Sequence, residues 1–309
     1  MFWFDQLVNG LTIGSVYALI ALGYTLVYGI LQMINFAHGE IFMIGAFAGW
    51  AVLLLLGGSA IGGPMLIVAL IAAMVAAALA SSASAVAIER IAYRRLRNAP
   101  RLAPLISAIG VSIALQNVVL KLTGGRDRVY PRIFPTGEVG VGDFSVGYIQ
   151  AFLIAASIVM MAGLLVFIQR TRTGRAMRAV SEDRATASLM GVDVDRTIVT
   201  TFVVGAALAG VAGVLQGLWI PNIRGTMGFL PGIKAFTAAV VGGIGSVPGA
   251  MAGGYFLGLS ETVGRELLNQ LPGVSLPNEW RDVIAFSLLV LVLIFRPTGI
   301  FGERVSRRA

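Results

Sequence analysis

The 309-residue sequence contains no cysteine and only one histidine, His38. These absences exclude a disulfide framework, thiolate chemistry and an HExxH metal site, and no cluster of residues has metal-ligand spacing. Charge is also scarce, because Asp, Glu, Lys and Arg make up 12% of the residues, against roughly 25% in soluble domains. A GxxxxGK[ST] loop is missing as well, so the chain does not bind ATP through that motif. We therefore expect neither a metal nor a cofactor.

Apolar residues, in contrast, make up 57% of the chain and form runs of about 20, the length of helix that spans a hydrocarbon core. The runs lack the alternation of a membrane β-barrel. We predict an all-α integral membrane protein with one domain over residues 1–309, a polytopic bundle of eight or nine transmembrane or re-entrant segments. The N-terminal MFWFDQ has no basic region typical of a cleaved signal peptide, so the first helix is expected to be retained.

The third predicted span, residues 64–88, is rich in Ala and Ser and is expected to be enclosed by other helices. Two apolar stretches within 229–266 are separated only by the uncharged GGIGSVPG at 242–249, which we interpret as a break between two helices at or inside the membrane boundary. Whether 229–247 crosses or re-enters decides between nine spans and eight. An amphipathic outer segment is expected at 267–282. The remaining expected spans are 7–31, 35–56, 64–88, 102–122, 147–168, 197–220 and 283–295.

The basic residues predict the orientation. Of the 23 Lys and Arg residues, 15 fall in three segments, at 89–101, 170–196 and the C-terminal tail, and seven fall in the opposite loops. The positive-inside rule makes the three segments cytoplasmic, which places the C-terminus inside and, for nine spans, the N-terminus outside. The net charge of +8 is therefore explained by membrane topology, and no nucleic-acid partner is expected.

One charged segment, RTGRAMRAVSEDRATASLMGVDVDR at 172–196, lies between two apolar runs. Ser181 is predicted as the N-cap of a helix of about two turns, with Glu182 and Asp183 in its first turn and Gly191 just past its end. Such a short helix is marginal alone in water, so it must pack against a partner or against the flanking spans. Asp195 is expected to cap the span that follows.

Ionisable residues inside apolar segments are default site candidates. Asn35, His38 and Glu40 lie near the start of the second span, and the alternative is that they pair locally at the cytoplasmic interface. Lys234 is a candidate for a pore-facing or helix-bracing charge, although it can also snorkel to the outer interface. Glu261 and Arg265 are expected to form an i, i+4 pair. Gly242, Gly243 and Gly245, with the segment near Asn35, resemble the paired discontinuities of inverted-repeat transporters, or simply permit tight packing.

Four stretches carry a resemblance to a known family: NGLTIGSVYALIALGYTLVYGILQMINFAHGE (9–40), TRTGRAMRAVSEDRATASLMGVDVDR (171–196), FLPGIKAFTAAVVGGIGSVPGA (229–250) and RPTGIFGER (296–304). They resemble the branched-chain amino acid ABC importer permeases, most of all the LivH-type subunit, over nearly the whole chain. The resemblance implies a type II importer-like bundle in the bacterial inner membrane. It implies as partners a second homologous permease, two cytoplasmic ATP-binding subunits, a periplasmic binding protein and membrane lipid.

In that family the cytoplasmic loop carries a coupling helix related to the consensus EAA-xxx-G. The matching run here is Ala185, Thr186 and Ala187 followed by Gly191, without the leading Glu and the first of the two Ala residues, so exact contacts cannot be transferred. Small apolar side chains are expected to fill a cleft on the ATPase, with arginines at the rim. The full set of expected coupling residues is Arg175, Arg178, Ser181, Glu182, Asp183, Arg184, Ala185, Ala187, Leu189, Met190 and Gly191.

The leading interpretation is therefore a non-enzymatic transport subunit that moves branched-chain amino acids, with urea, short amides or another small solute as alternative substrates. A second interpretation is an ion-coupled carrier or channel that acts without an ATPase and uses His38, Glu40 or Lys234 as relay groups. An intramembrane enzyme is a third, for which no nucleophile and base are visible.

Overall fold

The computed structural model describes residues 2–96, 99–100, 102–135, 137–141, 144–271 and 275–301. The C-terminal tail, including the end of the RPTGIFGER motif, lies outside this range. The helices are α1 (Phe2–Leu31), α2 (His38–Leu55), α3 (Pro64–Ile88), α4 (Leu102–Thr123), α5 (Tyr148–Arg170), α6 (Arg172–Glu182), α7 (Arg184–Leu189), α8 (Val194–Trp219), α9 (Phe229–Gly242), α10 (Val247–Asn269) and α11 (Trp280–Phe295). A π turn and a 3-10 turn extend α3 over Glu89–Tyr93 and Arg94–Leu96, and a second 3-10 turn is Gly58–Ala60.

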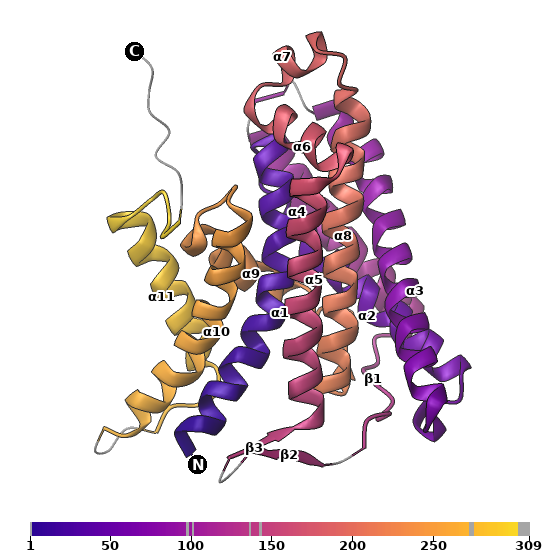
Figure 1. Cartoon of the computed structure of the whole chain (residues 1–309), viewed down its shortest axis with the longest axis vertical. Helices are drawn as coiled ribbons and strands as arrows, with labels where there is room; N and C mark the ends of the chain where they lie inside the picture. Colours follow the sequence, from indigo (N-terminus) through magenta and orange to yellow (C-terminus); the bar gives the residue numbers. More distant parts are fainter. Residues whose placement is uncertain are drawn as a thin grey trace.

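The helical bundle has two distinct ends (Figure 1). The short helices α6 and α7 lie at one end, and the strands and the N-terminus lie at the other. Within the described residues, six helical segments are long and apolar enough to cross a membrane, or seven if α9 and α10 count as one bent span. The six spans predicted between 7 and 220 each fall on one of these helices, so the helical membrane architecture is confirmed. The total of eight or nine segments stays a prediction.

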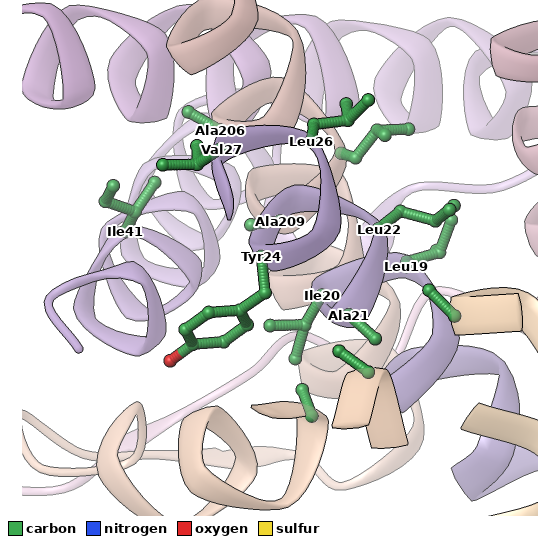
Figure 2. Packing of buried hydrophobic residues seen from close by; sticks show 14 of the residues in the cluster. Leu19, Ile20, Ala21, Leu22, Tyr24, Leu26, Val27, Ile41, Ala206 and Ala209 are labelled. Atoms are coloured by element: carbon green, nitrogen blue, oxygen red, sulfur yellow. The ribbon is translucent and has the colours of Figure 1, made fainter. Parts of the chain in front are cut away.

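The core is built around α1, in which every residue from Gly14 to Val27 is buried. Figure 2 shows the side chains of this helix pointing outward on several sides, with Leu22 on one side and Tyr24 on another, toward neighbouring elements. Glycines permit close helix packing as predicted: a Cβ added at Gly14 would lie 2.8 Å from the Cα of Tyr255 in α10, and one at Gly45 of α2 would lie 2.3 Å from the Cα of Gly210 in α8. Close backbone packing of this kind is typical of membrane helices.

The expectation that 64–88 is enclosed on all sides is wrong. One face of α3 is buried and carries small residues at every fourth position, including Ala73, Ala77 and Ser81. The opposite face exposes bulky residues, with Ile71 58% and Leu79 66% exposed. Because residues four apart share a helix face, the small residues form a packing stripe against α2 and α8, and the branched ones form an apolar outer face.

The predicted break within 242–249 is confirmed, because α9 and α10 are bent by 120° across residues 243–246. Gly243 and Gly245 adopt positive φ values of 109° and 96°, which glycine reaches without steric cost. The segment after α11 closes this turn: the amides of Ile300 and Phe301 donate to the carbonyls of Val241 and Gly242. The C-terminal motif thus caps the end of α9 by occupying carbonyls that a helix terminus leaves unpaired.

Four short strands depart from the all-α prediction. β1 (Arg128–Val129) pairs antiparallel with β4 (Asn222–Ile223), and β2 (Glu138–Val141) pairs antiparallel with β3 (Phe144–Gly147). Strand pairs as short as these have no readable periodicity in the sequence. The predicted amphipathic outer segment at 267–282 includes the end of α10 at Asn269 and the start of α11 at Trp280, and residues 272–274 lie outside the described range.

Candidate functional sites in the bundle and at its basic end

A polar group lies inside the bundle where α2 begins, and we call Asn35, His38 and Glu40 the polar centre. The chain between α1 and α2 is not helical over residues 32–37, so α2 starts beside the body of α1. His38 is 2% exposed and packs edge-on against Tyr24, with ring centroids 4.9 Å apart. Gly23 makes room for it, because a Cβ there would lie 2.1 Å from His38 Nε2.

The start of α9 meets the start of α2 at the same place. A Cβ added at Gly39 would lie 2.3 Å from the carbonyl oxygen of Gly228, and one at Gly232 would lie 2.9 Å from the Cα of Gly39. Only residues without a side chain allow this approach. The N-terminal ends of α2 and α9, where the helix dipoles are positive, therefore converge beside the polar centre.

Glu40 is fully buried, and its two carboxylate oxygens differ. Oε1 accepts hydrogen bonds from Gln116 Nε2 at 2.7 Å and Ser112 Oγ at 3.1 Å, both on α4. Oε2 has no hydrogen-bond partner among the described residues. Asn35 Oδ1 accepts from the Tyr93 hydroxyl at 2.6 Å and from the amide of Ala37 at 3.1 Å. Asn35 therefore pairs locally, and all three side chains are buried within the protein.

A cavity of about 520 Å³ opens next to Ser112 and Gln116. We call it the α4 cavity. Its other walls are apolar and come from the segment before α2, from α4 and from the first turns of α9. They are Phe36, Ile109, Ile113, Phe229 and Ile233. Polar residues at positions 112 and 116, one helical turn apart in an apolar span, were a signal that the sequence interpretation missed.

Lys234 belongs to a second buried group, on the other side of α9. Its Nζ lies 3.0 Å from Glu261 Oε2 on α10 and 2.6 Å from Asp282 Oδ1 on α11. The Tyr17 hydroxyl of α1 also donates to Glu261 Oε2, at 3.2 Å. Of the predicted roles, the bracing contact is the one the geometry supports, because a side chain only 6% exposed does not snorkel.

The expected pair between Glu261 and Arg265 is wrong. Glu261 faces Lys234, whereas the Arg265 side chain donates to the carbonyls of Leu276 and Pro277. Spacing made this pair plausible, but burial of Glu261 draws it to a cation from another helix.

The predicted path residues are therefore not gathered in one place. Asn35, His38 and Glu40 lie at the start of α9, whereas Gly242 ends it and Gly243 and Gly245 follow in the turn. A helix of 14 residues separates these ends by roughly 20 Å at about 1.5 Å per residue.

At the α6–α7 end, the predicted helix is two helices, and its N-cap is wrong. Ser181 lies in the last turn of α6 and donates to the carbonyl of Arg178. Glu182 ends α6, and Asp183 is the N-cap of α7, accepting from the amides of Ala185 and Thr186. A hydrogen bond from the Thr186 hydroxyl, together with these two backbone bonds, lowers the pKa of Asp183. Both Ser and Asp can cap a helix, so local sequence did not distinguish them.

The predicted C-terminal glycine is correct, because Gly191 follows the C-cap Met190 with φ of 84°. The other capping expectation is wrong: Asp193, not Asp195, caps α8 by accepting from the amide of Arg196. Asp195 instead forms an ion pair with Arg94 at 3.0 Å.

The predicted coupling residues in and just after α7 differ in their exposure to solvent. Leu189 and Met190 are 87% and 80% exposed, whereas Ala187 is 4% exposed and packs into the bundle. Ala187 therefore cannot enter a partner's cleft in this arrangement.

The arginines of this end divide in the same way. Arg184 donates to the carbonyl of Ile30 at the end of α1, with its Nε at 3.0 Å, and Arg178 donates to the carbonyl of Ile168. Both thus secure the loop to the bundle, although Arg178, like Arg175, is exposed, whereas Arg184 is half-buried. A cavity of about 800 Å³ lies between the loop 180–185, the end of α1 and the start of α4.

The sequence matches known proteins over almost its whole length. Residues 6–293 match the family described as branched-chain amino acid transport system / permease component. The chain is 47% identical to the high-affinity branched-chain amino acid transport system permease protein BraD of Pseudomonas aeruginosa, over 97% of this chain and 96% of the relative. It is also 47% identical to the corresponding protein LivH of Escherichia coli K12, over 98% and 96%.

A more distant likeness is to a solved structure described as PsaBC from Streptococcus pneumoniae in complex with Fab. It has a TM-score of 0.46 and 14% identity and covers 94% of this chain and 91% of that chain. The sequence matches decide the family, since they are long and cover nearly the full length of the relatives. The family match includes the first three of the four motifs noted above. The chain is a member of the branched-chain amino acid transport permease family.

Proposed function

We propose that this chain is the membrane permease subunit of an ATP-binding-cassette importer and translocates branched-chain amino acids delivered by a periplasmic binding protein. The named relatives BraD and LivH are described as permease proteins of high-affinity branched-chain amino acid transport, and 47% identity over almost the full length supports the same substrate class. The chain hydrolyses no ATP in this proposal, and two cytoplasmic ATP-binding subunits supply the energy. A second, homologous permease completes the pathway within the lipid bilayer.

The proposed topology has nine crossings in a type II importer-like bundle of the inner membrane, with the N-terminus outside and the C-terminus in the cytoplasm. The proposed crossings are α1, α2, α3, α4, α5, α8, α9, α10 and α11, and successive ones run in opposite directions between the two ends of the bundle (Figure 1). Residues 32–37 complete the crossing of α2, and residues 220–228 complete that of α9. The α6–α7 end then faces the cytoplasm, in agreement with its arginines. Non-helical backbone at membrane depth is tolerated where it is buried in protein or lines a cavity. Asn35 and Ala37 in the first of these segments, and Ile223, Gly225 and Gly228 in the second, are buried.

The observation that carries the proposal is the form of α7. A six-residue helix with an Asp183 cap projects from the bundle end and exposes two large apolar side chains, Leu189 and Met190. Exposed apolar side chains on a short, secured helix fit a cleft of a soluble partner. ATP-driven closure of the ATPases would move this loop and shift the bundle between outward-open and inward-open states.

The test is a Leu189→Asp/Met190→Asp variant of the complete transporter. We expect loss of ATPase subunits on co-purification and at least 10-fold slower ATP-dependent leucine uptake into proteoliposomes, because burying two charges is unfavourable. Folding should be retained, since both positions are exposed. Val139→Asp, exposed in β2 at the opposite end, is the matched control. Normal ATPase association and uptake in the α7 variant would refute the coupling role.

An ion-coupled carrier that acts without an ATPase is the second candidate, and the unpaired Glu40 Oε2 is the observation in its favour. It predicts uptake by the purified chain alone, driven by an ion gradient and without ATP. Urea and short amides are the alternative substrates within the importer proposal. Competition of each with labelled leucine, in the complete transporter, separates the substrate classes.

A further inference from the structure

We propose that an acidic face of the periplasmic binding protein docks on a cluster of cations at the end of the bundle opposite α7. We call this cluster the outer basic patch, and its members are Lys121, Arg126, Arg128, Arg132 and Arg224. The inference rests on the proposed function and its orientation, and deepens them by assigning the surface and the charge that the partner recognises. Three observations carry it: the concentration of the cations, their lack of acidic partners and the support beneath them.

The cations are concentrated in two short segments. Residues 121–132 and 221–228 contain five basic residues and one acid, Asp127, a net charge of +4. These five are most of the seven Lys and Arg residues that the proposed topology places outside. The positive-inside rule disfavours cations in short outward loops, so membrane insertion does not explain a cluster there. Another function has to account for it.

The fold brings the two segments together (Figure 1). β1 pairs antiparallel with β4, so Arg224, which directly follows β4, lies beside the segment that carries Arg128. Gly225 packs against the end of α4, because a Cβ added there would lie 3.3 Å from the amide nitrogen of Leu120, the residue before Lys121. Cations from distant parts of the sequence therefore form one patch.

The patch is not neutralised by the part of the chain that the structure describes. Four of its cations are exposed and form no ion pair or side-chain hydrogen bond with a described residue, namely Lys121, Arg126, Arg132 and Arg224. The acid among them, Asp127, accepts a hydrogen bond from Asn222 Nδ2 at 3.3 Å instead. Clustered like charges repel one another and attract a partner of opposite charge.

The patch is ordered by the core beneath it. Tyr130 is fully buried, and its amide donates to the carbonyl of Pro221 at 3.2 Å. Trp50 Nε1 donates to the carbonyl of Val129 at 3.0 Å, and the guanidinium carbon of Arg128 lies 5.7 Å from the centre of the Trp50 ring. A surface that is ordered before binding loses little conformational entropy on binding.

A hollow of about 270 Å³ borders the patch at Arg132. Its walls include the aromatic side chains of Phe134, Tyr148 and Trp219. Arginine and aromatic residues are the types enriched in protein interfaces. A side chain with an apolar stem and a terminal carboxylate fits this combination, which favours Asp or Glu on the partner.

Anionic lipid headgroups carry the same charge as an acidic protein face. The negative surface potential that attracts basic segments belongs to the cytoplasmic leaflet, however, and the outer basic patch faces the other side in the proposed orientation. Electrostatic complementarity with a protein, in contrast, accelerates encounter and fixes the register of docking. The binding protein is therefore the favoured occupant.

The experiment separates the binding protein from lipid, and charge from shape. We use the complete transporter in nanodiscs and measure the concentration of leucine-loaded binding protein that gives half-maximal stimulation of ATP hydrolysis, together with thermal stability. The reversed variant is Arg126→Glu/Arg132→Glu/Arg224→Glu, and the matched control is Arg126→Lys/Arg132→Lys/Arg224→Lys, which retains the charge. Both should fold, because all three positions are exposed.

We expect the reversed variant to raise the half-maximal concentration about 100-fold, since electrostatic steering raises association rates about 10- to 1,000-fold. The control should change it less than about 10-fold, because lysine keeps the charge but loses the planar fork of arginine. Maximal hydrolysis and thermal stability should stay near wild type. In the wild type, the half-maximal concentration should rise between about 0.01 M and about 0.15 M ionic strength, which shortens the Debye length from about 30 Å to about 8 Å.

An unchanged half-maximal concentration in the reversed variant would overturn the inference, and so would an equal change in the control, because charge would then not be recognised. Absence of the ionic-strength effect in the wild type would overturn it without any variant. A difference between the reversed variant and the wild type that is present in phosphatidylglycerol nanodiscs and absent in phosphatidylcholine nanodiscs would assign the patch to lipid and also overturn it. Absence of any stimulation of the wild type by the binding protein would instead overturn the proposed function.

Discussion

Replacing Lys234 by Met should test whether the charge cluster of Lys234, Glu261 and Asp282 holds α9 in place against α10 and α11. Lys234 lies on α9, and its partners lie on α10 and α11, so three elements meet at one ammonium group. The side chains of Lys234 and Glu261 are 8% and 1% exposed, whereas that of Asp282 is 34% exposed. Water therefore stabilises Asp282 if the cation is removed, but it cannot reach Glu261.

The expected magnitude follows from that difference in burial. Removing one partner of a buried ion pair costs about 3–5 kcal/mol, because the other charge stays buried and uncompensated. At about 2–3 °C per kcal/mol for a chain of this size, Lys234→Met should lower the apparent Tm by roughly 6–15 °C. A Lys234→Met/Glu261→Met double variant should recover at least half of this loss, since apolar side chains replace a buried pair with little cost.

The assay is the temperature at which the purified protein leaves the monodisperse peak on size-exclusion chromatography, at one heating rate. Lys121→Met is the matched control, because Lys121 is the other lysine of the chain and is exposed. The reasoning is refuted if Lys234→Met lowers the Tm no more than Lys121→Met does. It is also refuted if the double variant is less stable than Lys234→Met, because relief of an unpaired Glu261 is the basis of the estimate.

Two further predictions concern packing and capping. Gly23→Ala should cost about 1–3 kcal/mol of stability, because its methyl group would lie 2.1 Å from His38 Nε2, whereas Gly29→Ala, with nothing within 4 Å, should be neutral or stabilising in the same thermal assay. The pKa of Asp183 is lowered by its bonds to α7, so the cap is complete above the ordinary carboxyl pKa of about 3.9 and is lost as the pH falls through the lower folded value. Hydrogen exchange at the amide of Thr186 should accelerate in Asp183→Ala but not in Asp183→Asn at neutral pH, and equal rates in all three proteins would contradict the capping role.

Much of the fold could be predicted because membrane helices obey a composition rule over about 20 residues. The helical break at 242–249 was visible for a similar reason, since a run of glycine without charge is unusual between two apolar stretches. The capping residues of α7 and α8 were misassigned because several residues in a row were acceptable caps, and only the backbone angles select one. The strand pairs escaped prediction because each strand has too few residues for a period.

The candidate sites were predictable as residue types but not as groups. The position of Lys234 and Glu40 in apolar segments marked them as exceptional, but the sequence did not indicate their partners. Glu261 is 27 positions from Lys234, and Gln116 is 76 positions from Glu40. Pairs at such separations depend on how helices pack, and helical spacing carries information only about three or four positions along the chain.

The sequence by itself determined that the chain is a helical membrane protein, which segments are apolar, where its arginines gather and which family its motifs resemble. These properties are local, because the bilayer imposes length, hydrophobicity and internal hydrogen bonding on each segment separately. The tertiary structure alone decided that the N-termini of α2 and α9 meet at Gly39 and Gly228, that Glu40 lies beside the α4 cavity, and that Lys234 pairs with two acids. Those facts arise from glycine contacts between distant helices, and such contacts have no signature within any one segment.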